Sequence, residues 1–407
     1  MTFSPGSIYQ QENTFWPYWL KWCPSSSYLA ILAETRLLNR VNSVKEIILV
    51  PVLHKKHCIR TLYVYRNNFN SEEERQIYFN NYPIVLVHGM GAGLAMWCKN
   101  LDALAERRQV YVFDLIGFGN SSRPAFSDNN IKVENTFIQS IEDWRIYLGL
   151  KKFIILGHSL GGYLAFSYGI KFGHTLLHII LADPWGFREC KSRFESPFYM
   201  NWTLSLLSFL FKYLNPLFPV RLFGPFAPYI LRLVRQDLGV TFTPAQISLN
   251  IIKDDKLISS QPTGDLGNID EKDDHQGFVL KHTESDLGAI FDYVYHCNTR
   301  TPSGEAAFKR LSDPIGWAAR PMIKRINDLD SEIDVTFIYG GKSWMDWQTG
   351  YQAQHLRMNS TVNVKVIDDA GHHVYAEASN DFNNYVNSIC EAVQNSQNLL
   401  TRKILSN

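Results

Sequence analysis

A five-residue turn, Gly157-His158-Ser159-Leu160-Gly161, constrains this chain more than any other feature. It follows an apolar run that ends at Leu156 and precedes a second apolar stretch from Tyr163. Gly-x-Ser-x-Gly between a strand and a helix is a nucleophile elbow, which exposes its serine at the apex of a sharp turn. The positions two before and two after the serine crowd each other, so both need glycine. The sequence therefore predicts a buried strand, a strained Ser159 and a helix in direct succession.

A second Gly-rich turn lies earlier in the chain. The apolar run 83–87 ends in His88-Gly89-Met90-Gly91-Ala92-Gly93. Glycines let a backbone approach a ligand and aim its N–H groups at a developing negative charge. We expect the N–H groups of Leu160 and of Met90 (or Gly91) to form an oxyanion hole. The alternative is an ordinary strand–helix turn, in which His88 bonds to the backbone.

A serine nucleophile also needs a base, and the base needs a carboxylate to fix its tautomer. The chain offers Ser159, Asp346 and His372 in the order Ser, acid, His, each after a predicted strand. Asp183 is the competing acid, at the end of the strand before the insertion, and His373 is the competing base. These signals in this order predict an α/β-hydrolase fold with Ser159, Asp346 and His372 as the triad.

The apolar patterns predict a mostly parallel central sheet flanked by helices. We expect a hairpin over 47–66, an exposed loop over 67–80, and a helix near 33–38 that is capped by one of three serines at 25–27. The remaining expected elements are strands at 83–87, 110–114, 152–156, 177–183, 333–341 and 362–367, and helices at 135–148 and 381–397.

The strand–helix alternation stops between residues 184 and 329. We therefore expect a hydrolase core at 46–183 and 330–398 and a cap insertion at 184–329, with a flexible loop near 259–277. Apolar segments broken by proline within 202–233 favour cap helices over an apolar pocket, with ordinary core helices as the alternative.

The first 45 residues form a separate, aromatic-rich arm and helix. Trp16, Trp19 and Trp22 lie close together and are interrupted by proline. Tryptophan combines an apolar body with a polar edge, which suits the boundary between water and lipid. We expect an anchor on a membrane or lipid-droplet surface; the alternative is an arm packed into a groove of its own domain.

Composition limits the partners. A net charge of +1 gives no electrostatic case for nucleic acid. Six scattered cysteines without a CxxC pair, no visible signal peptide and no long apolar run favour a cytoplasmic protein associated peripherally with lipid. We expect no cofactor and no metal; the polar residues Asp273, Asp274 and His275 are read as part of a solvated loop.

Most of the chain, about residues 15–395, resembles abhydrolase domain-containing proteins 4 and 5. The resemblance rests on the segments 19–24, 88–93, 113–119, 183–187, 295–305, 316–322 and 372–376. The last three segments lie outside the general hydrolase pattern.

This resemblance implies one of two functions. One branch looks like a lysophospholipase acting on N-acyl phosphatidylethanolamine and its lyso form; the other activates a triacylglycerol lipase on lipid droplets and carries Asn at the nucleophile. Ser159 matches the enzyme branch, whereas Gly371 resembles the coactivator branch. Lys342 is basic like the Arg of that branch but cannot make its bidentate contact; the resemblance implies that both residues are partner-lipase contacts. The acyltransferase-like His-x4-Asp motif of the family becomes His372…Glu377.

We therefore expect a serine hydrolase that cleaves acyl esters of glycerophospholipids at a lipid surface. The alternatives are a lipase coactivator and a lysophosphatidic acid acyltransferase.

Overall fold

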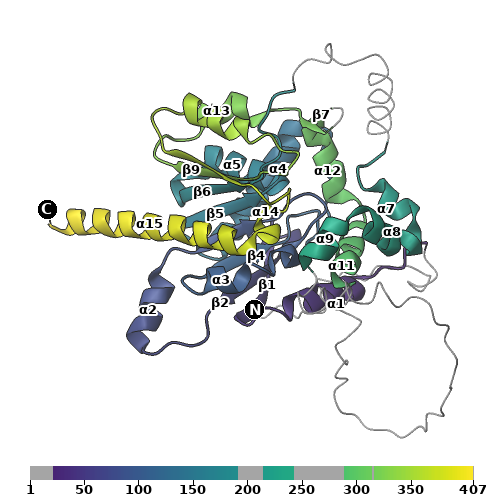
Figure 1. The fold of residues 1–407 in the computed structure, drawn as a ribbon, viewed down its shortest axis with the longest axis horizontal. Coiled ribbons are helices and arrows are strands. Elements are labelled where there is room, and N and C mark those ends of the chain that lie inside the picture. The colour runs from purple at the N-terminus through teal and green to yellow at the C-terminus, as the bar shows by residue number, and fades with distance from the viewer. Residues whose placement is uncertain (1–21, 191–213, 243–287, 314–315, 407) are drawn as a thin grey trace, which may run out of the picture.

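The structure is a computed structural model that describes residues 22–190, 214–242, 288–313 and 316–406. Its centre is an eight-stranded sheet in the order β1-β2-β4-β3-β5-β6-β9-β10 (Figure 1). The strands are β1 (Val44–Val52), β2 (His57–Tyr65), β3 (Ile84–Val87), β4 (Val110–Phe113), β5 (Phe153–His158), β6 (Leu176–Ala182), β9 (Asp334–Gly340) and β10 (Val362–Ile367).

Strand β2 runs antiparallel to both β1 and β4, and every other pair in the sheet is parallel. Two further short strands, β7 (Ser312–Asp313) and β8 (Trp317–Ala318), form a separate pair. The predicted hairpin and the mostly parallel sheet are confirmed.

Burial on both faces explains the apolar strands at the centre of the sheet. All six residues of β5 are buried. Ile155 packs into a cluster with α4 (Asn130–Tyr147) and α5 (Leu160–Phe172), whereas Ile154 packs into a cluster on the opposite face with α1 (Ser27–Leu38). Strands covered on both faces by helices read as continuous apolar runs.

The remaining helices flank the sheet or lie in the insertion. They are α2 (Glu72–Asn80), α3 (Leu101–Ala105), α7 (Phe218–Leu222), α8 (Ala227–Val234), α9 (Gln236–Phe242), α11 (Ala289–Asn298), α12 (Ser303–Leu311), α13 (Gln348–Leu356), α14 (Val374–Glu377) and α15 (Ser379–Ser406).

The loop expected over 67–80 is wrong, because most of it is the helix α2. Ser71 is its N-cap, and the Ser71 hydroxyl accepts the backbone N–H of Glu74 at 3.1 Å. Three glutamates in the first turn complement the positive end of the helix dipole. Tyr78 fixes the helix to the core, since its buried hydroxyl donates to the carbonyls of Ala105 and Arg108.

Within 184–329, the helices α7, α8, α9 and α11 gather with α1 on one side of the sheet (Figure 1). The division into arm, core and cap stays a prediction. Trp16, Trp19 and the segment 259–277 lie outside the described residues. In the described part of the chain, no helix is long and apolar enough to cross a membrane.

Candidate active site

Ser159 occupies the turn between β5 and α5 in a conformation that is rare for a residue with a side chain. Its φ is 51° and its ψ is −118°. A Cβ atom on Gly157 would lie 2.3 Å from the Gly161 carbonyl oxygen, and one on Gly161 would lie 2.3 Å from the Val87 carbonyl oxygen. Both glycines are therefore required by close packing around the serine.

Asp183 is the carboxylate that contacts His372. Strand β6 lies beside β5, with Ala182 opposite His158, so the next residue in each strand, Asp183 and Ser159, emerges at the same edge. The Asp183 Oδ2 atom lies 2.6 Å from His372 Nδ1. Asp183 also has a positive φ, 44°.

The expectation that Asp346 faces the His372 ring is wrong. The Asp346 carboxylate forms an ion pair with Arg188 at 3.2 Å and accepts the backbone N–H of Gln348 at 3.0 Å. Its loop follows β9, one strand farther from Ser159 than the loop that carries Asp183. Sequence order alone does not distinguish these two loops, because both end strands at the same edge of the sheet.

The Asp183 carboxyl is completely buried and surrounded by donors. Besides His372, it accepts the Ser343 hydroxyl at 2.5 Å and the Gly340 N–H at 3.3 Å. Burial raises the pKa of Asp183 above its ordinary value, and these three donors oppose that shift. The hydrogen bond to Asp183 orients the imidazole and fixes Nδ1 as its inner nitrogen.

His372 lies in the loop between β10 and α14, and its backbone is also held by a hydrogen bond. His158 Nε2 donates to the His372 carbonyl oxygen at 2.9 Å. Burial lowers the pKa of His158 well below the usual value, which keeps its ring neutral. The Trp344 ring lies 4.9 Å from the His372 ring, centroid to centroid, and covers one side of it.

His373 faces away from this pair. Its Nδ1 atom lies 3.8 Å from Asp237 of α9, and burial lowers its pKa to about 3. His373 is therefore a neutral, packed ring, and His372 alone of the two histidines contacts Asp183.

The Gly-rich loop after β3 lies directly beside the serine. A Cβ atom on Gly89 would lie 3.0 Å from Ser159 Cβ. Leu160 is the first residue of α5, where backbone N–H groups have no partner within the helix. The loop that contains Met90 and the start of α5 thus flank Ser159.

His88 is a structural histidine. Its buried ring accepts the Leu115 N–H at Nε2, 2.9 Å away, and Nδ1 bonds to the Gly89 carbonyl at 2.7 Å. Burial lowers its pKa to about 4, so the ring is neutral and carries its proton on Nδ1. It fixes the start of the Gly-rich loop.

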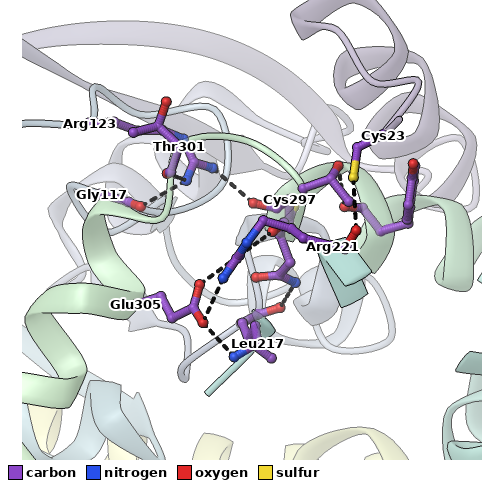
Figure 2. A network of polar contacts seen from close by, with 12 residues as sticks. Cys23, Gly117, Arg123, Leu217, Arg221, Cys297, Thr301 and Glu305 are labelled. Atoms are coloured by element: carbon purple, nitrogen blue, oxygen red, sulfur yellow. Dashed lines mark hydrogen bonds and ion pairs between the residues drawn. The ribbon is translucent and has the colours of Figure 1, made fainter. Parts of the chain in front are cut away.

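The insertion helices hold the same loop from the other side. Asn298, the last residue of α11, donates from Nδ2 to the Gly91 carbonyl at 2.7 Å. Arg221 of α7 donates to the Asn298 carbonyl at 2.9 Å and pairs with the buried Glu305 carboxylate at 2.7 Å (Figure 2). Sequence reasoning missed Asn298, although it lies in the segment 295–305 that carried the family resemblance.

Figure 2 also shows how the N-terminal arm joins this network. Cys23 donates from Sγ to the Arg221 carbonyl at 3.4 Å. Next to it, the Trp22 indole N–H lies 3.1 Å from the carbonyls of Arg221 and Leu222. The Trp22 side chain is nonetheless 63% exposed.

The two residues that matched the coactivator branch lie at the same edge of the sheet. Lys342 forms an exposed ion pair with Asp369 at 2.9 Å. The Gly371 N–H donates to the Glu377 carboxylate at 2.7 Å.

An aromatic cavity of about 360 Å³ lies next to this site, lined by Pro184, which follows Asp183, and by Trp344, which contacts His372. The Arg188–Asp346 ion pair forms part of its wall. Its large apolar lining residues are Trp185, Phe187, Trp317, Tyr339, Trp344 and Met345. Among the described residues, no cluster of three His, Cys, Asp or Glu side chains could hold a metal ion.

Known proteins share this architecture. A family model for the alpha/beta hydrolase fold matches residues 82–207. Carboxylesterase CesB from Bacillus subtilis superimposes with a TM-score of 0.53 at 13% identity, covering 89% of this chain and 97% of its own. A membrane phospholipase A gives a TM-score of 0.52 at 16% identity, covering 91% and 92%. At these identities the two structures support only the assignment of the fold.

Curated relatives are closer in sequence. The 1-acylglycerol-3-phosphate O-acyltransferase ABHD5 of Sus scrofa is 38% identical over 77% of this chain and 79% of its own. The abhydrolase domain-containing protein abhd-5.2 of Caenorhabditis elegans is 35% identical over 91% and 71%. The (lyso)-N-acylphosphatidylethanolamine lipase of Homo sapiens is 37% identical over 76% and 80%.

The sheet order and the turn at Ser159 are those of an α/β hydrolase. Within that class, the chain belongs to the family of ABHD5 and (lyso)-N-acylphosphatidylethanolamine lipase.

Proposed function

We propose that this protein is a serine hydrolase that cleaves acyl esters of glycerophospholipids at a lipid surface. The observation that carries the proposal is the 2.6 Å contact between His372 and Asp183, formed at the same edge of the sheet as the strained Ser159. A serine, a histidine and a buried carboxylate in these positions have the chemistry of acyl transfer to serine.

In the proposed reaction, the Ser159 oxygen attacks the ester carbonyl and His372 Nε2 takes the serine proton. Asp183 holds the imidazole in the required tautomer and stabilises its protonated form. The N–H groups of Leu160 and Met90 stabilise the negative oxygen of the tetrahedral intermediate. His372 then protonates the departing alcohol, and a water molecule activated by His372 releases the acyl chain from Ser159.

The described residues offer the Ser159 hydroxyl no hydrogen bond. Catalytic hydrogen bonds of this kind commonly tighten only when substrate is bound. We expect the contact between Ser159 and His372 to form in the complex with substrate.

The surroundings of the site favour a lipid substrate. The aromatic cavity next to His372 would accommodate part of an acyl chain, because its rings offer apolar surface without free charge. A relative bears the name (lyso)-N-acylphosphatidylethanolamine lipase. Together these observations favour a phospholipid or lysophospholipid ester.

Association with a membrane or lipid droplet is supported by exposed apolar side chains near Trp22. They belong to α7, α8 and the residues that join them: Leu222, Phe223, Phe226, Tyr229, Leu233 and Val234. Contiguous exposed apolar residues of this number favour a lipid or protein contact over bulk water. We infer that Trp16, Trp19 and Trp22 anchor the protein on the same lipid surface.

Acyl transfer to a second lipid is the other candidate, favoured by the name of the ABHD5 relatives. An acyl group on Ser159 would pass to the hydroxyl of lysophosphatidic acid instead of water. Both reactions use the same covalent intermediate, so they differ only in the acceptor.

The decisive experiment compares wild type with Ser159→Ala on vesicles that contain N-acyl phosphatidylethanolamine or its lyso form. We expect released fatty acid from wild type and at least about a thousandfold less from the variant. Ser388→Ala, which changes an exposed serine on α15, is the matched control.

Adding lysophosphatidic acid to the same assay distinguishes acyl transfer from hydrolysis by the product formed. Equal turnover by wild type and Ser159→Ala would refute the proposal. Equal stimulation of a triacylglycerol lipase by both proteins, without turnover by either, would instead indicate an adaptor.

A further inference from the structure

The Glu377 carboxylate accepts backbone hydrogen bonds from the residues on both sides of His372. Its Oε2 atom accepts the N–H of Gly371 at 2.7 Å, and its Oε1 atom accepts the N–H of His373 at 3.0 Å. Hydrogen bonds from backbone N–H groups to a carboxylate are charge-assisted and stronger than neutral ones. One side chain therefore fixes the peptide unit between Ala370 and Gly371 and the one between His372 and His373.

We propose that Glu377 is a positioning residue that sets the place of the His372 imidazole. The catalytic consequence rests on the proposed hydrolase function, because Glu377 acts only through His372. The His372 ring is otherwise held by Asp183 at Nδ1 and by the bond from His158 to its carbonyl. Neither of these contacts involves the backbone N–H groups on either side of His372. Glu377 accepts both of those N–H groups.

The glycine at 371 follows from this arrangement. A Cβ atom there would lie 2.9 Å from Glu377 Oε2 and 3.2 Å from Oε1. The φ angle of Gly371 lies outside the left-handed region, so backbone strain does not demand glycine. A side chain at 371 would force the Glu377 carboxylate to shift from its position on the two N–H groups, which gives this glycine a role within the chain itself.

The same contacts give the motif His372…Glu377 a structural meaning. Each carboxylate oxygen of Glu377 is already engaged by a backbone N–H. The Glu377 carboxylate thus faces the loop that carries His372. We infer that this motif holds the histidine in place and does not make a second acyl-transfer centre.

The first test measures Glu377→Gln and Glu377→Ala against Asp369→Asn, which alters an exposed carboxylate on the same loop. We expect the Glu377 variants to lower kcat by about tenfold to a hundredfold with KM changed less than about twofold, because a misplaced base loses rate without losing binding. Asp369→Asn should match wild type. An unchanged kcat in Glu377→Ala, or loss of acyl transfer with intact hydrolysis, would overturn the proposal.

Amide hydrogen exchange over 368–376 provides a readout that needs no activity. We expect exchange at Gly371 and His373 to accelerate at least about tenfold in Glu377→Ala, while β2, on the far side of the sheet from β10, keeps its protection. Unchanged exchange would refute the proposal that Glu377 holds these two N–H groups, even if kcat fell. If Ser159→Ala showed that the protein is no hydrolase, this measurement would still decide the role of Glu377.

The second test is a double-mutant cycle with Gly371→Ala. In wild type this change should lower kcat by more than about twofold, and by no more than Glu377→Ala does, because the new methyl group forces the carboxylate to shift. In the Glu377→Ala background it should cost less than about twofold, since nothing is left to displace. Equal costs in both backgrounds would show that Gly371 serves another purpose.

Discussion

At the scale of single residues, the site depends on which carboxylate reaches His372. Asp183 and Ser159 follow directly after paired residues of neighbouring strands, so the sheet itself brings them to one edge. Asp346 lies in the same region but is paired with Arg188. The contacts of the two aspartates, and not their positions along the chain, show which one faces His372.

Asp183→Asn should therefore lower kcat by about a thousandfold or more, because an amide cannot stabilise the imidazolium and favours the wrong tautomer. Asp346→Asn should change kcat by less than about threefold. Steady-state hydrolysis of a lysophospholipid by both variants measures the difference. A larger loss in Asp346→Asn than in Asp183→Asn would mean that His372 changes its partner during turnover.

At the scale of elements, local sequence signals account for the helix that a polarity argument missed. Ser71 and Glu74 stand at the first and fourth positions of a capping pattern, and only the polar composition of 67–80 suggested a loop. The nucleophile turn was predictable because sterics at Gly157 and Gly161 admit no side chain.

Replacing Ser71 by Ala should lower the free energy of unfolding by about 1 kcal/mol, since the Glu74 N–H loses its acceptor. Urea denaturation followed by circular dichroism measures this change. Ser71→Asp, which restores a capping oxygen, is the control and should stay close to wild type. A Ser71→Ala protein as stable as wild type would show that the Ser71 cap contributes nothing to the stability of α2.

Much of the sheet and the candidate serine and histidine could be predicted, because buried parallel strands leave apolar runs and the nucleophile turn has a strict spacing. The aspartate that contacts His372 could not, since two loops end at the same edge of the sheet and the sequence does not show that Asp346 pairs with Arg188. The contacts of Glu377 and Asn298 could not be predicted either, because both side chains bond to backbone groups of loops outside their own helices.

At the scale of the whole molecule, buried neutral histidines make the fold sensitive to acid. Burial lowers the pKa of His88, His178 and His296 to about 4 each, and that of His373 to about 3. In the unfolded chain each returns to about 6.5. The unfolded state therefore binds more protons, and the stability that these groups contribute above pH 6.5 is lost as the pH falls towards 4.

His178 offers a test away from the active site, because its Nε2 atom bonds only to Thr336. Between pH 7 and pH 5 this one histidine should remove about 2 kcal/mol of stability. The His178→Gln variant should show a smaller loss by about that amount over the same range. Chemical denaturation at several pH values measures both slopes, and parallel slopes would contradict the assignment.

Ser159 and Asp183 both hold positive φ angles, a region that residues with side chains rarely adopt. Each such residue costs on the order of 1–3 kcal/mol. The two strained residues follow adjacent strands, so a cost that is large relative to the net stability of a typical domain falls on one edge of the sheet. Selection for stability alone would remove this strain, so a lineage that dispensed with chemistry would be expected to relax first at these two positions.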